Sequence, residues 1–92
     1  MMEIKLEANL SDCIETVARR EYERALSILL RGNQEDRQLE EKLELLRLFL
    51  ESADFGRLRS LSEDLLLAGR RIRFILKSIN TLPGYEVEID KL

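Results

Sequence analysis

Charged and apolar residues alternate with a period of two at the start of the chain. Residues 3–8 read EIKLEA, so their charged and apolar side chains fall on opposite faces of an extended segment. This alternation predicts a β-strand with one face in solvent and the other on a core.

The period then changes to that of a helix. From Ser11 or Asp12 onward the apolar residues recur at helical spacing, and Asp12 and Glu15 have the spacing of a capping box. Gly32 predicts the end of this helix, because glycine adopts the left-handed conformation at a helix C-terminus without steric cost. The apolar positions of this first helix are Ile14, Val17, Ala18, Tyr22, Ala25, Ile28 and Leu29.

Two more helices are predicted between Asn33 and Ala68. Asn33 is a typical N-cap for the second helix, and acidic residues follow in its first turn, where the helix dipole favours anions. A short link at residues 52–54 leads into the third helix, and such links predict antiparallel neighbours. The apolar positions of the two helices are Leu39, Leu43, Leu46, Leu50, Ala53, Leu58, Leu61, Leu65 and Ala68.

Gly69 decides whether residues 70–78 form a helix or a strand. If the third helix continues through Gly69, its apolar heptad extends to Ile79 and the protein is mostly α, a three-helix bundle with short terminal strands. If the helix ends there, residues 70–78 form a strand with one apolar and one basic face. The apolar face comprises Ile72, Phe74 and Leu76, the basic face comprises Arg71, Arg73 and Lys77, and Ile75 is left as an exposed apolar residue.

The segment that follows favours the strand. Residues 85–90 read YEVEID, which alternates as a strand does, and Pro83-Gly84 before it predicts a turn. Antiparallel pairing of residues 70–78 with residues 85–90 places bases opposite acids, and the acids of residues 3–8 can flank the same bases from the other side. We therefore predict an α+β fold in which three helices pack on one face of a small antiparallel sheet, in the order β-α-α-α-β-β.

The composition fits one folded domain. A chain of 92 residues, 45% of them hydrophobic, can build one core but not two, so residues 1–92 are predicted to form a single domain. The net charge of -3 argues against a dedicated nucleic-acid binder. The charge is uneven, however, because bases outnumber acids only in residues 55–80.

The sequence offers little catalytic chemistry. It contains no histidine, which excludes Ser-His-Asp and Cys-His systems, and Cys13 alone can form neither an intramolecular disulfide nor a zinc site. No apolar run reaches the length of a membrane span. We therefore expect no enzymatic activity, no cofactor or metal, no membrane association and a cytoplasmic location. Cys13 is expected to be a small core residue, with a reactive thiol near a helix start as the alternative.

A basic cluster formed by Arg70, Arg71, Arg73 and Lys77 is the candidate recognition site. On a strand, three of these side chains share a face, where they could bind a nucleic acid or an acidic partner, or pair with acids of the same sheet. Phe74 has the opposite parity and is expected to face the core, whereas RNA-binding sheets expose aromatic residues beside their bases.

The leading functional hypothesis is a noncatalytic protein–protein interaction or self-association module. The two terminal strands are expected to be sheet edges, and an unpaired edge can bind a second subunit or a partner strand. A homodimer or a protein partner is therefore expected, and nucleic-acid or acidic-partner binding through residues 70–77 is the alternative. A weaker hypothesis, an enzymatic pocket for a carboxylated substrate, involves Arg20, Arg24, Gln38 and Arg47.

Overall fold

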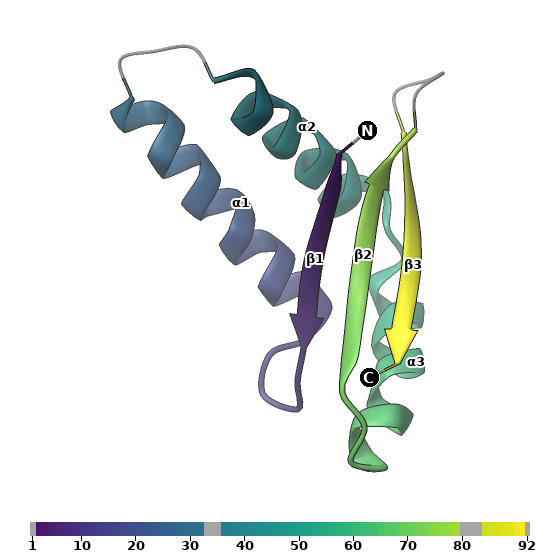
Figure 1. Ribbon diagram of the computed structural model, residues 1–92. Helices are drawn as coiled ribbons and strands as arrows, with labels where there is room; N and C mark the ends of the chain where they lie inside the picture. The colour runs from purple at the N-terminus through teal and green to yellow at the C-terminus, as the bar shows by residue number, and fades with distance from the viewer. Residues whose placement is uncertain (1, 33–35, 80–83, 92) are drawn as a thin grey trace.

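The computed structural model describes residues 2–32, 36–79 and 84–91 and confirms the predicted α+β fold. Its elements follow one another in the order β-α-α-α-β-β (Figure 1). The N-cap of the second helix is Asp36 rather than the predicted Asn33. The predicted turn at Pro83 lies outside the described residues. The elements are β1 (Glu3–Ala8), α1 (Ile14–Arg31), α2 (Arg37–Ser52), α3 (Phe55–Leu67), β2 (Ile72–Ser78) and β3 (Tyr85–Lys91).

The sheet is antiparallel, and the basic strand β2 lies between the two acidic strands β1 and β3. In its register Leu6 lies opposite Phe74, and Phe74 lies opposite Ile89. Because side chains alternate along a strand, this register places the apolar residues of all three strands on one face and the charged residues on the other. The alternation seen in the sequence thus sets both faces of the sheet.

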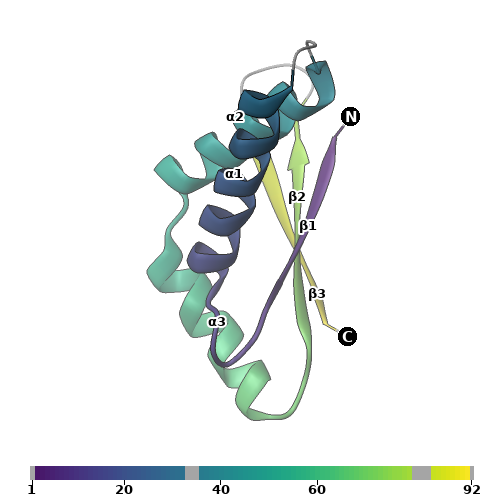
Figure 2. The ribbon, with the colours of Figure 1, turned by 90° about the vertical axis from the view of Figure 1, so that its left-hand side faces the viewer.

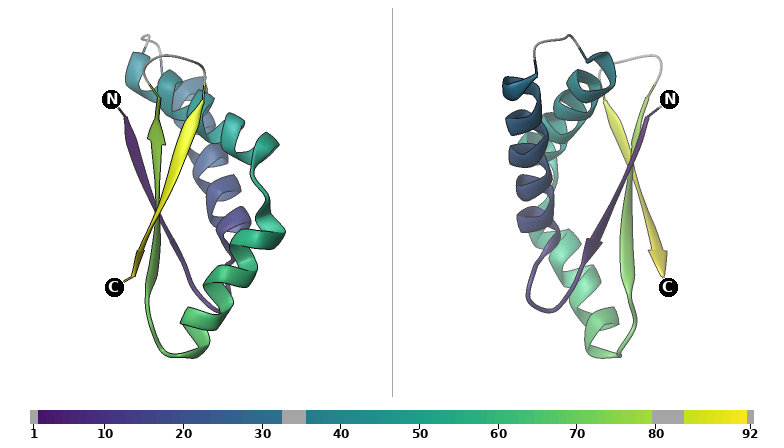
Figure 3. Two further views of the ribbon diagram at one scale, coloured as in Figure 1. Left: turned by 90° about the vertical axis from the view of Figure 1, so that its right-hand side faces the viewer. Right: turned by 60° about the vertical axis from the view of Figure 1, so that its left-hand side comes forward.

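All three helices cover the apolar face, and the charged face is open (Figures 2 and 3). The core lies between the two layers, with Phe49 of α2 and Phe74 of β2 as its largest fully buried side chains. Burial of this apolar surface is the main force that holds the helices on the sheet. The other buried members of the core cluster are Ile4, Leu6, Ala8, Ile14, Ala18, Leu45, Leu46, Ile72 and Leu76.

Gly69 ends α3 as the strand interpretation requires. Its φ is +76°, the left-handed region that side chains with a Cβ rarely adopt. The Gly69 N–H donates to the Leu66 carbonyl and the Arg70 N–H donates to the Leu65 carbonyl, both at 3.0 Å. These two bonds form a Schellman motif, which satisfies the last carbonyl groups of the helix before the chain enters β2.

The two ends of α1 differ from the predictions. Its N-cap is Cys13, without a side-chain cap, so the predicted capping box is wrong. The Asp12 carboxylate instead accepts from the Arg20 guanidinium at 3.2 Å, and this pairing lowers the pKa of Asp12. At the other end the helix stops at Gly32, as predicted, but Gly32 is extended, with φ -77°, so its predicted left-handed conformation is wrong.

The direction of α3 also differs from the prediction. The antiparallel neighbours are α1 and α2, which pack along each other, whereas α2 and α3 make little contact. In Figure 1, α3 continues beyond the end of α2 and runs along the sheet behind β3. Asp54 caps α3 by accepting from the Arg57 N–H at 3.1 Å. No helix among the described residues is both long and apolar enough to cross a membrane.

Candidate functional site

The predicted basic cluster lies mainly on the open face of the sheet, where neighbouring acids neutralise it. Arg73 Nη2 donates to Asp90 Oδ2 at 2.5 Å, which joins β2 to β3. Lys77 Nζ lies 2.6 Å from Glu88 Oε2 of β3 and 3.8 Å from Glu3 Oε1 of β1. The hydrogen bond and the charge of Glu88 raise the pKa of Lys77, so this amine stays protonated.

The other two members of the cluster precede β2. Arg71 Nη2 lies 3.5 Å from Glu7 Oε2, an ion pair between two exposed side chains. Arg70 is exposed, and its backbone N–H takes part in the cap of α3. Since three of the four predicted site residues have carboxylate partners, the cluster is a set of cross-strand contacts rather than a free basic patch. Phe74 faces the core, as predicted.

Ile75 is less exposed than predicted. It projects from the open face of β2, yet only 9% of its surface remains accessible. In the register it lies between Lys5 and Glu88, with Arg73 and Lys77 on either side along its own strand. Long charged side chains bury apolar surface with their stems while their ends stay in water. The ion-pair layer therefore also covers an apolar residue.

The free edge of β3 is the candidate interaction site. The Ser78 N–H donates to the Met2 carbonyl on the β1 side of β2, and the Ile79 N–H donates to the Gly84 carbonyl on the β3 side. Because successive residues of a strand direct their N–H and C=O groups to opposite sides, the even-numbered residues of β3 bond to β2 and the odd-numbered residues point away from it. The N–H and C=O groups of Tyr85, Val87, Ile89 and Lys91 consequently face outward from the sheet. No described helix or strand lies beyond β3 in Figure 1, whereas the α1–α2 hairpin extends past β1.

A groove of about 320 Å³ adjoins this edge on the helix side. Val87 of β3 and Leu58 and Leu61 of α3 contribute its apolar lining. Leu61 is 49% exposed, and no leucine of α3 is fully buried, since the buried residue of this helix is Ser62. The edge of β3 therefore combines unpaired backbone groups with uncovered apolar side chains.

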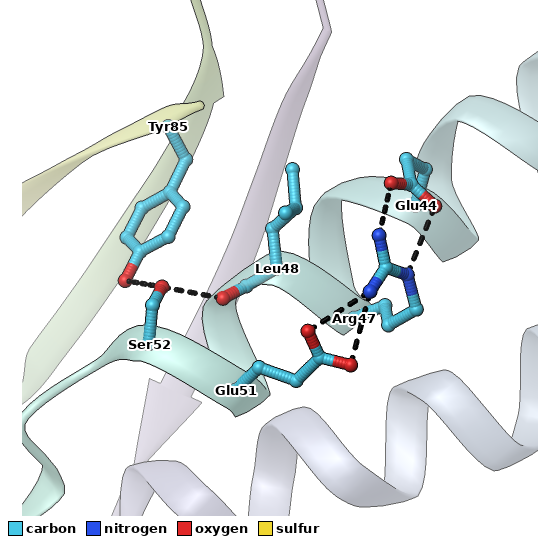
Figure 4. A network of polar contacts seen from close by, with 6 residues as sticks. All are labelled: Glu44, Arg47, Leu48, Glu51, Ser52 and Tyr85. Carbon is cyan, nitrogen blue, oxygen red and sulfur yellow. Dashed lines mark hydrogen bonds and ion pairs between the residues drawn. The ribbon is translucent and has the colours of Figure 1, made fainter. Parts of the chain in front are cut away.

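Tyr85 fixes the start of β3 to the end of α2, beside the groove (Figure 4). Ser52 Oγ donates to the Leu48 carbonyl at 2.5 Å, so the Tyr85 hydroxyl donates to Ser52 Oγ, at 2.7 Å. The Tyr85 ring also meets the ring of Phe49 edge-on, with centroids 5.5 Å apart. These contacts hold one wall of the groove in place. The groove was not predicted from the sequence, because leucines around more than one face of α3 indicate incomplete burial without showing which of them lie beside β3.

The same view shows Arg47 of α2 between Glu44 and Glu51 (Figure 4). The guanidinium donates to both carboxylates one turn away on either side, and these contacts raise the pKa of Arg47 and lower that of Glu44. The Arg47 side chain is thus held along the surface of α2 by two acids of its own helix.

A second cavity, of about 400 Å³, lies beside the start of α1. Cys13 lines it and is partly exposed, so it is not the core residue that the sequence favoured. Its Sγ lies 3.3 Å from Thr16 Oγ1 and 3.8 Å from Arg59 Nη2. Hydrogen bonds from the side chain and backbone of Thr16, with a smaller contribution from Arg59, lower the pKa of the Cys13 thiol.

We expect Thr16→Val to raise the pKa of Cys13 towards the value of a free thiol, because valine keeps the shape of threonine but lacks the hydroxyl. Thr16→Ser, which keeps the hydroxyl, is the matched control. The pH dependence of the rate of alkylation by iodoacetamide measures the pKa in all three proteins. Identical midpoints in the Val variant and the native protein would show that the Thr16 hydroxyl does not contribute.

The described residues contain no group of three or more acidic or cysteine side chains placed to hold a metal ion. In comparisons with known proteins, a protein-family model matches residues 2–79, which run from β1 to just beyond β2. An uncharacterized protein from Archaeoglobus fulgidus is 41% identical over 69 residues, which cover 73% of this chain and 78% of the relative. No solved structure matches significantly.

Proposed function

The chain belongs to the protein family that its residues 2–79 match, and we propose that it is a noncatalytic protein–protein interaction module that binds an extended segment of another protein at the free edge of β3. The observation that carries this proposal is the groove lined by Leu58, Leu61 and Val87 beside that edge. In strand addition, main-chain hydrogen bonds supply affinity and pockets for alternate side chains supply specificity. Both features lie side by side here.

Val87→Pro tests whether β3 accepts a strand. Proline removes the N–H that faces outward, while the hydrogen bonds from β3 to β2 are made by Glu86 and Glu88 and are retained. Val87→Thr keeps both the N–H and the branched side chain, and is the matched control. Peptides selected by display on the native protein should bind the Pro variant about tenfold more weakly or worse, because a bound strand loses main-chain hydrogen bonds.

The Thr variant shows whether a loss of peptide binding is specific to proline. Selected peptides that bind the native protein and the Thr variant, but not the Pro variant, support binding at the edge of β3. Peptides that bind the Pro variant as tightly as the native protein would place the interaction elsewhere, and recovery of no binding peptide from an unbiased library would contradict the proposed function.

Nucleic acid is not the expected ligand of the basic cluster. Arg73 and Lys77 have their charges paired across the sheet, and phosphate binding would have to displace Asp90 and Glu88. We expect a labelled single-stranded oligonucleotide to show no saturable change in fluorescence anisotropy at low salt. Binding that weakens steeply as salt rises would contradict this expectation and favour the alternative function.

A further inference from the structure

We propose that the partner segment bound by β3 alternates basic with apolar residues, so that its basic side chains meet the acidic face of β3 and its apolar side chains enter the groove beside α3. This inference rests on the proposed function and specifies the chemistry of its partner.

The acidic side chains of β3 all lie on one face of the strand. Glu86, Glu88 and Asp90 project from the open face, and their register partners lie only on the β2 side. Residues directly opposite each other on neighbouring strands point to the same face of a sheet. A strand added at the free edge would therefore present every second side chain to these three carboxylates, where opposite charges stabilise cross-strand pairs and like charges destabilise them.

The remaining side chains of the added strand would face the helices. They would lie opposite Val87 and Ile89, which are half-buried, and next to Leu58 and Leu61 of α3. Apolar side chains at these positions would remove the exposed part of the groove from water, which is favourable in proportion to the apolar area covered. The two faces together require alternation of basic and apolar residues in the bound segment.

Strand β2 already alternates basic and apolar residues and lies beside the acidic strand β3. In β2, Arg73 pairs with Asp90 and Lys77 pairs with Glu88, while Phe74 and Leu76 face the core. Glu86 lies opposite Lys77 and its charge helps to raise the pKa of that lysine, but it makes no ion pair within the described part of the chain, so its carboxylate can also pair with a base of an added strand. The arrangement on the inner side of β3 thus shows what the outer side would accept.

A second copy of the chain does not fit this edge. Because Tyr85, Val87, Ile89 and Lys91 point their backbone groups outward, antiparallel pairing of two β3 strands aligns odd-numbered with odd-numbered residues and even with even. In the three registers with the greatest overlap, Glu88 would then face Glu86, Glu88 or Asp90 of the other copy. Juxtaposed like charges suppress that pairing and leave the edge for a basic segment.

Three synthetic peptides test the inference with the full-length protein. One alternates lysine and valine, one alternates glutamate and valine, and one has the composition of the first with its lysines clustered. In fluorescence anisotropy titrations at low salt, the lysine–valine peptide should bind about three- to tenfold more tightly than the glutamate–valine peptide. A lysine attracts Glu86 and a glutamate repels it, whereas Glu88 and Asp90 already pair with bases of β2. The clustered peptide should also bind more weakly, and hydrogen exchange at the Val87 amide should slow only with the alternating peptide.

These outcomes distinguish strand addition at β3 from the basic chemistry proposed for the partner. Equal affinity for the lysine–valine and glutamate–valine peptides, with loss of both in Val87→Pro, would overturn the basic chemistry of the partner but leave strand addition intact. If neither the alternating peptides nor any display-selected peptide binds at the edge, strand addition itself fails. A dimer detected by light scattering and abolished by Val87→Pro would instead make a second copy the occupant.

A charge reversal tests whether the acids of β3 act locally. Glu86→Lys should weaken binding of the lysine–valine peptide about three- to tenfold, because one attractive pair becomes repulsive. Glu41→Lys changes the net charge by the same amount at an exposed position of α2, away from β3, and should leave the affinity unchanged. Equal losses in the two variants would show general attraction to an acidic protein and would overturn the inference.

Discussion

Phe49→Ala is expected to lower the free energy of unfolding by about 3 to 5 kcal/mol, the range for truncation of a buried phenylalanine. Phe49 has no accessible surface and packs edge-on against the rings of Phe55 and Tyr85, at centroid distances of 5.2 and 5.5 Å. The substitution removes the side chain at which α2, the start of α3 and β3 meet, and leaves a cavity there. Urea denaturation followed by circular dichroism measures the loss.

The effect should be large relative to the whole stability of the domain. Small domains are stable by about 0.05 to 0.15 kcal/mol per residue, so the variant is expected to be partly unfolded under mild conditions. Leu30→Ala is the control, because Leu30 is 76% exposed and its truncation should change the unfolding free energy by no more than about 0.5 kcal/mol. Equal midpoints for the two variants would contradict the central position of Phe49 in the core.

Gly69→Ala is expected to destabilise the protein by about 1 kcal/mol. An L-residue in the left-handed conformation costs about 1 to 2 kcal/mol, and the lower chain entropy of alanine in the unfolded state offsets part of this. The cost comes from the φ of +76° alone, because a Cβ at Gly69 would meet no atom within 4 Å. The same denaturation experiment measures the change.

Gly56→Ala supplies a control with the opposite sign. Gly56 lies in the first turn of α3, and its Cβ would meet only Asp54 Oδ1 at 3.5 Å, an ordinary contact. Alanine favours the helical conformation, so this variant should be as stable as the native protein or more stable, by up to about 1 kcal/mol. A loss of stability at Gly56 as large as at Gly69 would show that the left-handed conformation is not the cause.

The candidate site was only partly accessible from the sequence. The ion pairs of Arg73 and Lys77 could be predicted, because parity and antiparallel pairing determine which charges face each other across a sheet. The groove could not be predicted, because it depends on how far α3 covers β3. The periodicity of Leu58 and Leu61 is the same whether or not another element lies over them. Binding at the edge of β3 stays a prediction that the peptide experiments test.

The sequence alone determined the type and order of the elements, the faces of the strands and the stop at Gly69. These follow from local physics: the two-residue period of a strand, the spacing of apolar residues in a helix, and the conformational freedom of glycine. Tertiary structure decided the rest. Gly32 took an extended conformation, Ile75 was covered by charged neighbours, and α3 left leucines uncovered beside β3. Each of these depends on which residues distant in sequence occupy the surrounding space, and no local pattern encodes that.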